Sequence, residues 1–391
     1  DGGNRVIIKP NSDLTPLSKY EVLIKNTLKS TTNSNLKVQY NFPFNTAIDL
    51  SDKFERITED ELLTLVQKQT FTYFWDFGHP NSGMIRERNT SNQTVTTGGT
   101  GFGLMAILIG VNRNFISKAE GLERTKKIVS FLKLADKYHG AFSHWYDGAT
   151  GKTQPFSEKD DGADLVETSL LFQGLLAARE YFQDSDLSEE INTLYNAVEW
   201  NFFQNDQQVL FWHWSPNHTW DLNLKIQGWN ESLITYVLAA GASAHAIEKS
   251  VYDQGWANNG GIKNGKNYFG YTLPLGPDNG GPLFTAQYSF LGINPIGLKD
   301  AYADYDLQVK NQTLINRAYC ISNPNQYYGY GPNNWGLTAG DIPNGYGAQS
   351  PSNDIGVIAP TAALSSMPFT PNESKEALAY FYYKLGDKLW G

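Results

Sequence analysis

The spacing of apolar residues changes at Thr58, and this change divides the chain in two. Before it, short β-branched and aromatic runs are separated by Pro, Ser, Asn and Thr, as in NRVIIKP, YEVLIKN and LKVQYNFPF. Runs of this length and composition are typical of β-strands. We therefore expect residues 1–52 to be a small β module of three strands, followed by a second domain over residues 53–391, with FNTAIDLSDKF as the linker.

From Thr58 onward, apolar residues recur with the period of a helix, about 3.6 residues. The segments with this pattern are 58–76, 100–113, 118–138, 161–182, 187–203, 229–241, 245–256, 281–291, 304–320, 357–366 and 372–389. The connections between them are alternately long and short, and the long ones are rich in Gly and aromatic residues. If each helix runs antiparallel to the one before it, all the long connections meet at one end of the domain.

Two kinds of helix alternate in this pattern. FGLMAILIG and LVETSLLFQGLLAA are apolar nearly all round, as buried helices are, whereas GLERTKKIVSFLKLADKY has a charged face. Alternating inner and outer helices predict an all-α main domain with the architecture of an (α/α)6 toroid or barrel, preceded by the small β segment. The pattern would place the last inner helix beyond Gly391. A solenoid of stacked helix pairs is the alternative.

The composition of the chain limits the kinds of molecule that it is expected to bind. A net charge of -9 and a pI near 5.2 disfavour nucleic acid and anionic membranes. Aromatic residues make up 14% of the chain, which suits a flat, neutral ligand such as a sugar. The single cysteine, Cys320, leaves no disulfide framework and no thiolate metal site. No nucleotide-binding or nucleophile-elbow motif occurs, so we expect no cofactor, and we expect a monomer.

The stretch KDDGADLVETSLLFQ, residues 159–173, holds the densest group of carboxylates. On a helix, Asp160, Asp164 and Glu167 would share one stripe at the long-loop end. Three interpretations compete: acidic residues such as Asp161 that cap the helix, a magnesium–diphosphate site of DDxxD type, or the floor of a sugar-cleaving pocket. The diphosphate site needs a second metal motif, and NDIGVIAPTAAL supplies none.

A glycosidase needs a second carboxyl group that faces the first across the bond. Glu231 in GWNESL is the natural candidate, with Trp229 and Asn230 beside it. Its alternative role is that of a first-turn glutamate that favours the helix dipole. Trp145, Trp212, Trp214, Trp220 and Trp335 lie in long loops, where they either stack on sugar rings or pack locally.

The role of several other polar residues can be interpreted in two ways. His144 in AFSHWYDG either binds a hydroxyl group or is a structural histidine, and Arg86 either contacts substrate or pairs with Glu87. His213 and His218 have no third ligand in sequence, so we expect no metal site.

Taken together in this order, TGGTGFGLMA, HWYDGATGK, DGADLVETSLLFQGLLAAREYF, GWNESL, GPLFTAQYSFLGI, WGLTAGD and IAPTAALSSMPFTP resemble the bacterial glucoamylase-like proteins, which include the β-1,2-glucanases of glycoside hydrolase family 144. The resemblance covers roughly residues 58–391, and the preceding segment resembles part of an Ig-like module. It implies an (α/α)6 barrel, an extracytoplasmic (periplasmic or outer-membrane-associated) enzyme and inversion at the anomeric carbon. It also implies an acidic pocket of Asp160, Asp164, Glu167 and Glu231.

We therefore expect a hydrolase of a neutral glucan, most of all β-1,2-glucan. The residues expected to bind substrate are Arg86, His144, Trp145, Trp214, Trp229, Asn230, Trp335 and Asp341. Family members continue past LWG with another acidic residue, so closure of the barrel and the full acid and base pair depend on residues after Gly391. The alternatives are an exo-acting α-glucosidase and a glycan-binding protein without turnover.

Overall fold

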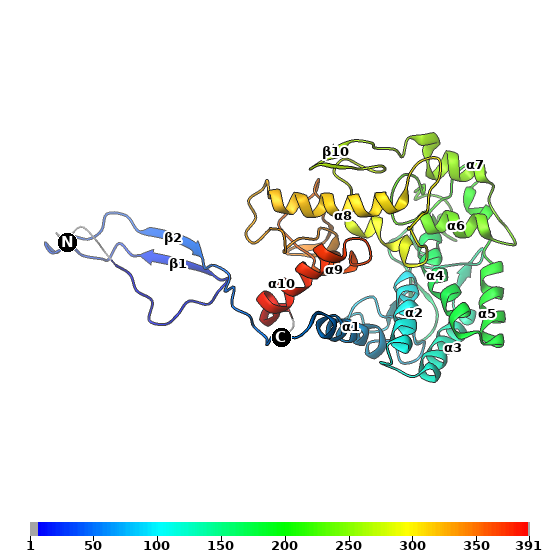
Figure 1. The fold of residues 1–391 in the computed structure, drawn as a ribbon, viewed down its shortest axis with the longest axis horizontal. Coiled ribbons are helices and arrows are strands. Elements are labelled where there is room, and N and C mark those ends of the chain that lie inside the picture. Colours follow the sequence, from blue (N-terminus) through cyan, green and yellow to red (C-terminus); the bar gives the residue numbers. More distant parts are fainter. Residues whose placement is uncertain (1–6, 390–391) are drawn as a thin grey trace. The chain divides into compact units, whose positions relative to one another are not determined.

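The structure is a computed structural model that describes residues 7–389 (Figure 1). Contacts within the chain separate it into two compact units, one of Asp1–Arg56 with Ala379–Gly391 and the other of Ile57–Leu378. Across the described residues, no helix is both long enough and apolar enough to span a bilayer.

The first unit contains one antiparallel hairpin, β1 (Lys19–Ile24) and β2 (Tyr40–Asn45), with Tyr20 opposite Phe44. The end of α10 (Pro371–Leu389) belongs to the same unit, where Lys384 forms an ion pair with Asp52 at 2.6 Å.

The third predicted strand, NRVIIKP, is not found in the part that can be described. Residues 4–6 lie outside the described residues, and residues 7–10 are not in a strand. Pro10 has no N–H to donate to a ladder, and Ile7 is 80% exposed, so nothing covers this run.

The second unit is helix-rich and of α/α type, with small hairpins between the helices (Figure 1). Its helices are α1 (Glu59–Asp76), α2 (Thr97–Asn112), α3 (Lys118–Leu134), α4 (Leu165–Phe182), α5 (Ser185–Asn196), α6 (Leu233–Gly241), α7 (Lys249–Val251), α8 (Tyr305–Ser322), α9 (Pro360–Ser365) and the start of α10. Shorter helical turns are η1 (Trp200–Gln204), η2 (Tyr252–Trp256), η3 (Asn258–Gly260), η4 (Leu283–Ala286) and η5 (Tyr288–Leu291). The strands are β3 (Thr94–Thr96), β4 (Lys137–Tyr138), β5 (Ala141–Phe142), β6 (Trp145–Asp147), β7 (Thr153–Gln154), β8 (Ala163–Asp164), β9 (His213–Trp214), β10 (Asn267–Tyr268), β11 (Tyr271–Thr272), β12 (Ala339–Ile342) and β13 (Gly345–Ala348).

Side-chain caps set where several helices begin. Thr58 and Glu61 form a capping box at the start of α1, and Ser117 and Glu120 form another at the start of α3. These boxes satisfy N–H groups that have no partner inside the helix. The predicted starts at positions 58 and 118 are therefore confirmed to within a residue.

The close crossing of α2 and α4 positions the candidate site. A Cβ on Gly101 would lie 1.9 Å from the carbonyl oxygen of Leu170, and one on Gly174 would lie 2.3 Å from that of Gly101. Only glycine permits this approach. As predicted, α4 is buried on nearly every side, whereas α3 buries one stripe. The crossing brings the first turn of α2 beside the first turn of α4.

Several predicted helices are shorter than expected. The segment 281–291 forms two 3-10 turns, η4 and η5, that are separated at Gln287, whose backbone leaves the helical region. The segment 245–256 is the three-residue α7 followed by a π turn, because Gly255 packs directly against the backbone of Val209. Similarly, α5 ends at Asn196 rather than at 203, and a 3-10 turn follows it.

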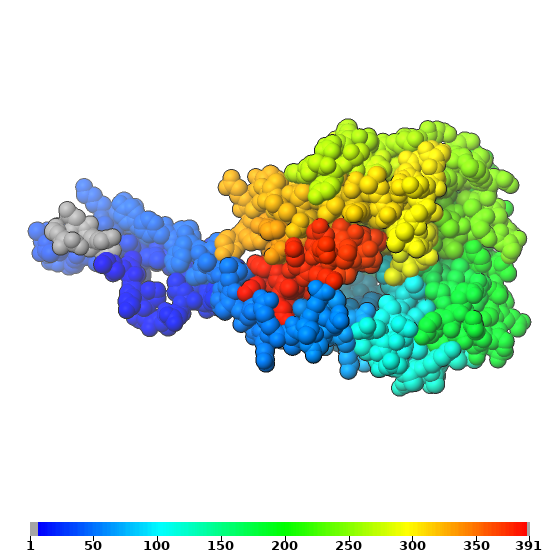
Figure 2. Space-filling view, in the orientation of Figure 1, coloured from blue at the N-terminus to red at the C-terminus, as the bar shows by residue number. Residues whose placement is uncertain are grey.

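The second unit also has a hollow of about 410 Å³ between α2 and α9. Phe102 of α2, Tyr288 of η5 and Ala362 of α9 line it, and it opens between the cyan, yellow and red regions in Figure 2. The ring of Tyr288 lies edge-on to that of Phe102, with ring centres 4.7 Å apart.

Candidate active site

The acidic stretch at 160–167 is a strand followed by a helix, not one helix. Asp164 ends β8, which pairs with β9 so that Asp164 lies opposite His213. Asp164 is also the N-cap of α4, since its Oδ1 accepts the backbone N–H of Glu167 at 2.9 Å. The predicted stripe of Asp160, Asp164 and Glu167 is therefore wrong. Of the three aspartates considered as helix caps, Asp160, Asp161 and Asp164, only Asp164 caps α4, and Asp161 accepts a hydrogen bond from Asn217 at 2.6 Å.

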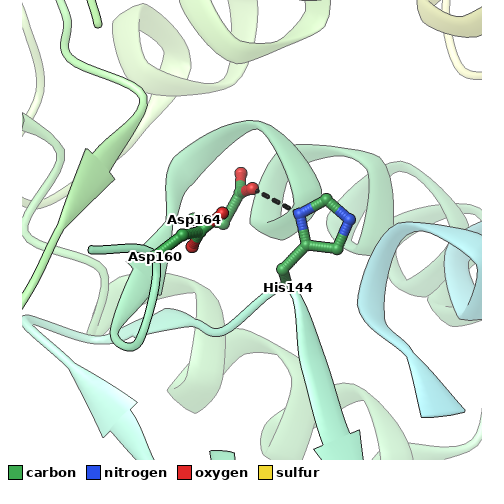
Figure 3. A group of neighbouring side chains, drawn as sticks. All are labelled: His144, Asp160 and Asp164. Carbon is green, nitrogen blue, oxygen red and sulfur yellow. Dashed lines mark hydrogen bonds and ion pairs between the residues drawn. The ribbon is translucent and has the colours of Figure 1, made fainter. Parts of the chain in front are cut away.

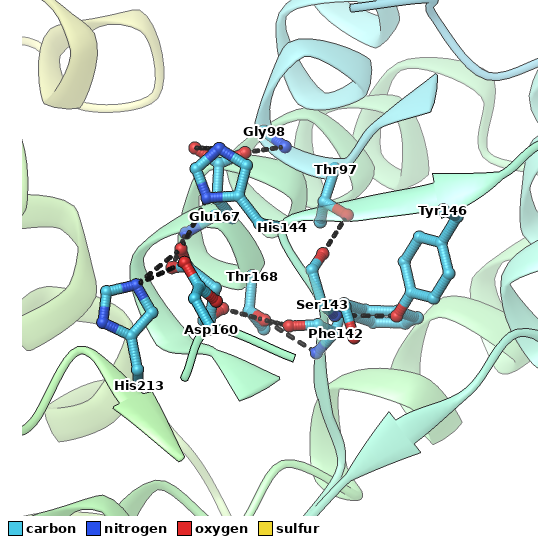
Figure 4. Close-up of polar contacts among 11 residues, drawn as sticks. Thr97, Gly98, Phe142, Ser143, His144, Tyr146, Asp160, Glu167, Thr168 and His213 are labelled. Carbon is cyan, nitrogen blue, oxygen red and sulfur yellow. Dashed lines mark hydrogen bonds and ion pairs between the residues drawn. The ribbon is translucent and has the colours of Figure 1, made fainter. Parts of the chain in front are cut away.

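Two histidines hold the buried aspartates (Figures 3 and 4). The Nδ1 atom of His144 lies 2.9 Å from Asp164 Oδ2. The Nε2 atom of His213 lies 3.2 Å from Asp160 Oδ2 and 3.3 Å from Asp164 Oδ2. The side chains of Asp160 and Asp164 are 5% and 0% exposed, so a substrate cannot reach the oxygens of Asp164 directly. The two histidine side chains are 23% and 11% exposed, so both lie partly buried beside these aspartates.

The charges of this cluster stabilise one another. Burial alone would lower the pKa of each histidine, but Glu167 and Asp164 raise that of His144 to about 9. Asp160 and Asp164 likewise raise the pKa of His213 to about 10. In return, although burial opposes it, the two histidines hold the pKa of Asp164 well below its usual range. Asp164 is therefore a permanent anion, and both imidazoles are cations at neutral pH.

Glu167 is the most exposed carboxylate of this group, with 17% of its side chain accessible to solvent, against 5% for Asp160 and 0% for Asp164. Its Oε2 atom accepts the N–H of Gly98 at 2.7 Å, at the N-terminal turn of α2, and its Oε1 lies 4.0 Å from His144 Nε2 (Figure 4). A Cβ on Gly98 would lie 2.6 Å from Glu167 Oε2, so only glycine leaves room for this contact. Burial, together with Asp164, raises the pKa of Glu167, while His144 lowers it.

Glu231 lies in the turn before α6, which begins at Leu233 after the N-cap residue Ser232. The helix does not start at position 229 as predicted, so Glu231 is not a first-turn residue. Its carbonyl oxygen accepts the hydroxyl of Ser289 at 2.5 Å, which fixes the turn. Burial, followed by the charges of Glu167 and Asp164, raises the pKa of Glu231 to about 7. Glu231 is thus close enough to Glu167 and Asp164 for their charges to affect its protonation.

The same cluster contains a group with metal-ligand chemistry. One ligand atom each of His144, Asp160 and Asp164 lies within 4.8 Å of the others (Figure 3). Histidine must be neutral to bind a metal. Here both ring nitrogens of His144 point to carboxylates and its pKa is raised to about 9, so protons already balance the charge that a cation would balance.

Several known proteins are similar to this chain in sequence and in fold. A family described as "Glycoamylase: Putative glucoamylase" matches residues 223–391. A protein of the same description from Bacteroides uniformis ATCC 8492 is 54% identical, and the match covers 86% of this chain and 84% of that one with a TM-score of 0.85. The chain belongs to this glucoamylase-like family.

Two further relatives of the glucoamylase-like domain carry names that state an activity. The endo-β-1,2-glucanase from Chitinophaga pinensis is 49% identical, with a TM-score of 0.82 over 84% of this chain and 83% of that one. The exo β-1,2-glucooligosaccharide sophorohydrolase of Parabacteroides distasonis is 44% identical over 363 residues. That match covers 86% of this chain and 50% of the relative, so the chain spans about half of that protein's length.

Most tryptophans expected as sugar platforms in the glucoamylase-like domain are part of its core. Trp335 is fully buried, and Trp229 is 8% exposed and donates its Nε1–H to Gln312 at 2.7 Å. Trp214 packs edge-on against His139 and Phe202. These placements correct the prediction that Trp229 and Trp335 offer ring faces to substrate. Trp145 alone among the predicted substrate-binding tryptophans lies beside the acidic cluster, with its ring edge-on to His144 at 5.5 Å.

Three polar residues predicted to bind substrate have partners within the chain. Arg86 donates to the carbonyl oxygens of Asn92, Phe77 and Gly78, and Glu87, its predicted alternative partner, pairs with Arg88. Asn230 accepts the N–H of Ser232 at 2.9 Å. Asp341, on the hairpin β12–β13, forms an ion pair with Arg88 at 3.4 Å.

His213 is the functional residue that the sequence did not reveal. It stands in the run FWHW, where it is the polar residue between two tryptophans, and only strand pairing shows that it meets Asp164. Gly98, in TGGTG, was likewise visible only as part of a glycine-rich motif.

Proposed function

We propose that this chain hydrolyses β-1,2-linked glucan, with Glu231 as general acid and Glu167 as general base. The observation that carries the proposal is the state of Glu231: burial, followed by the charges of Glu167 and Asp164, raises its pKa to about 7, so it can hold the proton that a general acid donates. Glu167 is the carboxylate of the neighbouring cluster that is partly exposed, and the N–H of Gly98 donates to it at 2.7 Å, which favours its charged form.

The reaction would proceed in one displacement. Glu231 donates its proton to the glycosidic oxygen, and the bond from the anomeric carbon to that oxygen breaks. A water molecule attacks the anomeric carbon from the opposite face and gives its proton to Glu167, so the configuration inverts. Glu167 suits the base role because it is partly exposed, whereas Asp160 and Asp164 are buried under it. Those two aspartates position Glu167 and His144.

The linkage is supported by the named relatives, since both act on β-1,2-linked glucose chains. The purified chain should be incubated with β-1,2-glucan, maltooligosaccharides, starch and other glucans, and the products separated by chromatography. We expect sophorose or short β-1,2-linked oligosaccharides from β-1,2-glucan, with the inverted anomer formed first, and little action on starch. Glucose released from maltooligosaccharides with β-1,2-glucan untouched would establish the α-glucosidase alternative, and binding without reducing-sugar release would establish a glycan-binding protein.

The finer architecture belongs to the same proposal. The paired buried and amphipathic helices, such as α4 and α3, support an (α/α)6 toroid around the acidic cluster. The amphipathic hairpin β1–β2, with Tyr20, Phe42 and Phe44 on one face, supports an Ig-like module before it. A polymeric substrate supports an extracytoplasmic location, and we expect the chain to act as a monomer.

A further inference from the structure

An exposed aromatic ring lies directly against the acidic cluster. Phe156 is 52% exposed, and its ring centre is 4.4 Å from that of His144 and 4.9 Å from that of Trp145. Its backbone N–H donates to the carbonyl oxygen of Asp160 at 2.9 Å, so the turn that carries Asp160 also carries Phe156. One face of the ring is thus supported by the protein while the remainder stays open to solvent.

A second exposed ring lies on the β12–β13 hairpin. Tyr346 is 66% exposed and stands directly opposite Asp341 in the antiparallel register, so both side chains project from the same face of the hairpin. Asp341 uses that face to form its ion pair with Arg88. With two thirds of its surface exposed, the Tyr346 ring is open to solvent.

The hairpin is adjacent to the Glu231 side of the site. Thr338 and Ala339, where β12 begins, line the same hollow as Tyr288. Thr338 also accepts the N–H of Phe284 through its hydroxyl, at 3.1 Å, which ties the hairpin to η4. Ser289, the residue after Tyr288, donates its hydroxyl to the carbonyl oxygen of Glu231 at 2.5 Å, so the lining of the hollow adjoins the turn that carries Glu231.

We propose that Phe156 and Tyr346 are the sugar-stacking platforms of this site, Phe156 beside the Asp164 and Glu167 group and Tyr346 beside Glu231. The proposal rests on the proposed function and specifies the part of it that binds substrate. Flat rings with one open face bind the apolar faces of pyranose rings. Two platforms on the two sides of the acid pair would hold the glucose units on either side of the bond that is cleaved. The predicted tryptophans Trp229 and Trp335 cannot do this because they are buried.

The test uses Phe156→Ala and Tyr346→Ala in the full chain. The KM for a defined β-1,2-linked gluco-oligosaccharide should rise at least about tenfold in each variant, with kcat changed much less, because a stacking contact made before and during the reaction contributes uniform binding. Phe156→Tyr and Tyr346→Phe keep the flat ring and should stay within about twofold of wild type. Phe156→Leu keeps apolar bulk without a flat ring and should behave like the alanine variant.

Tyr40→Ala is the matched control, because Tyr40 is a 50% exposed aromatic on the β1–β2 hairpin, and it should leave KM unchanged. Circular dichroism and melting temperature verify that each variant is folded.

Oligosaccharide binding measured by calorimetry separates this proposal from the proposed function. If the wild-type chain turns over substrate and the KM is unchanged in both alanine variants, the platform proposal is wrong and the proposed hydrolase activity stands. Binding that both alanine variants weaken, without turnover by wild type, supports the platforms and overturns the hydrolase. Absence of both binding and turnover in wild type overturns both.

Discussion

Asp164 and Glu231 are both carboxyl groups withdrawn from water in one site, yet their surroundings give them opposite states. Asp164 meets two histidines within 3.3 Å and caps α4, so its anion is stabilised from three directions. Glu231 lies in a turn, and within residues 7–389 no cation forms an ion pair with it. Burial, followed by the charges of the neighbouring anions Glu167 and Asp164, raises its pKa to about 7. Burial is common to both; the placement of cations decides which one keeps its proton.

The ion pairs of the site are concentrated around Asp164. Asp160, Asp164 and Glu167 bring three negative charges, and His144 and His213 return two positive ones. Ion pairs of this kind are strongly disrupted when one partner is removed, because the other is left buried and unpaired. The Glu231 side carries no such network and can change its protonation state during a reaction.

The largest effect is expected from Glu231→Gln. The amide keeps the shape of the neutral acid but cannot donate a proton to the leaving oxygen, so kcat on β-1,2-glucan should fall at least about a hundredfold. Because the pKa of Glu231 is raised to about 7, its carboxyl group is about half protonated at pH 7, and the neutral amide should hardly change the melting temperature. Steady-state kinetics and thermal denaturation measure the two quantities. Glu180→Gln, on the exposed face of α4, is the matched control. Near-normal kcat in Glu231→Gln would mean that another group is the acid.

Asp164→Asn should mainly cost stability. Asparagine can still cap α4, but it leaves His144 and His213 without their shared anion, and the unfolding free energy should fall by about 3 kcal/mol. Urea denaturation followed by tryptophan fluorescence measures the change. Asp161→Asn is the control, since Asp161 is bound only by surface-loop partners such as Asn217. Equal stability in the two variants would show that the histidines do not depend on Asp164.

Much of the helical framework could be predicted from the sequence because it depends on local signals. A few neighbouring residues are enough to indicate these helices, as the capping boxes at Thr58 and Ser117 and the uniformly apolar α4 segment show. Asp160, Asp164 and Glu167 were predicted as one acidic stripe from helical spacing, and Glu231 as the second carboxyl group that a glycosidase needs; the order of the motifs implied the same four residues. The structure brings Asp160, Asp164 and Glu167 into one hydrogen-bonded group, and Glu231 into its electric field.

What could not be predicted depends on contacts between distant segments. The pairing of β8 with β9 moves the start of α4 to Leu165 and brings His213 onto Asp164, across about fifty residues of chain. The sequence shows that a residue is aromatic, but not whether its ring is exposed to a sugar or packed in the core. Trp335 and Phe156 both lie in long loops, yet the first is fully buried and the second is half exposed. Burial is set by the whole fold, and no local pattern reports it.

The pH dependence of turnover should sharpen the contrast between the two acids. Glu231 must be protonated to donate, so kcat should fall as the pH rises through about 7, by roughly tenfold per unit well above it. Asp164, whose pKa is lowered, remains ionised throughout the neutral and mildly acidic range and should contribute no limb there. Initial rates between about pH 4 and 9 measure the profile. Activity that is constant up to about pH 9 would contradict the assignment of Glu231 as the acid.

The smallest effect is expected from chelation. His144, Asp160 and Asp164 are close enough to bind a divalent cation, but the cluster is already balanced by two imidazolium groups, whose pKa values are raised to about 9 and about 10. A cation would have to displace a proton from a histidine and break its hydrogen bond to Asp164, which opposes binding at neutral pH. Dialysis against EDTA should therefore change kcat less than about twofold, and added zinc or calcium should not raise it. Loss of turnover on chelation that one added metal restores would show that this metal replaces the histidine protons. The Asp164 side and the Glu231 side of the site would then differ by a bound cation and not by protonation.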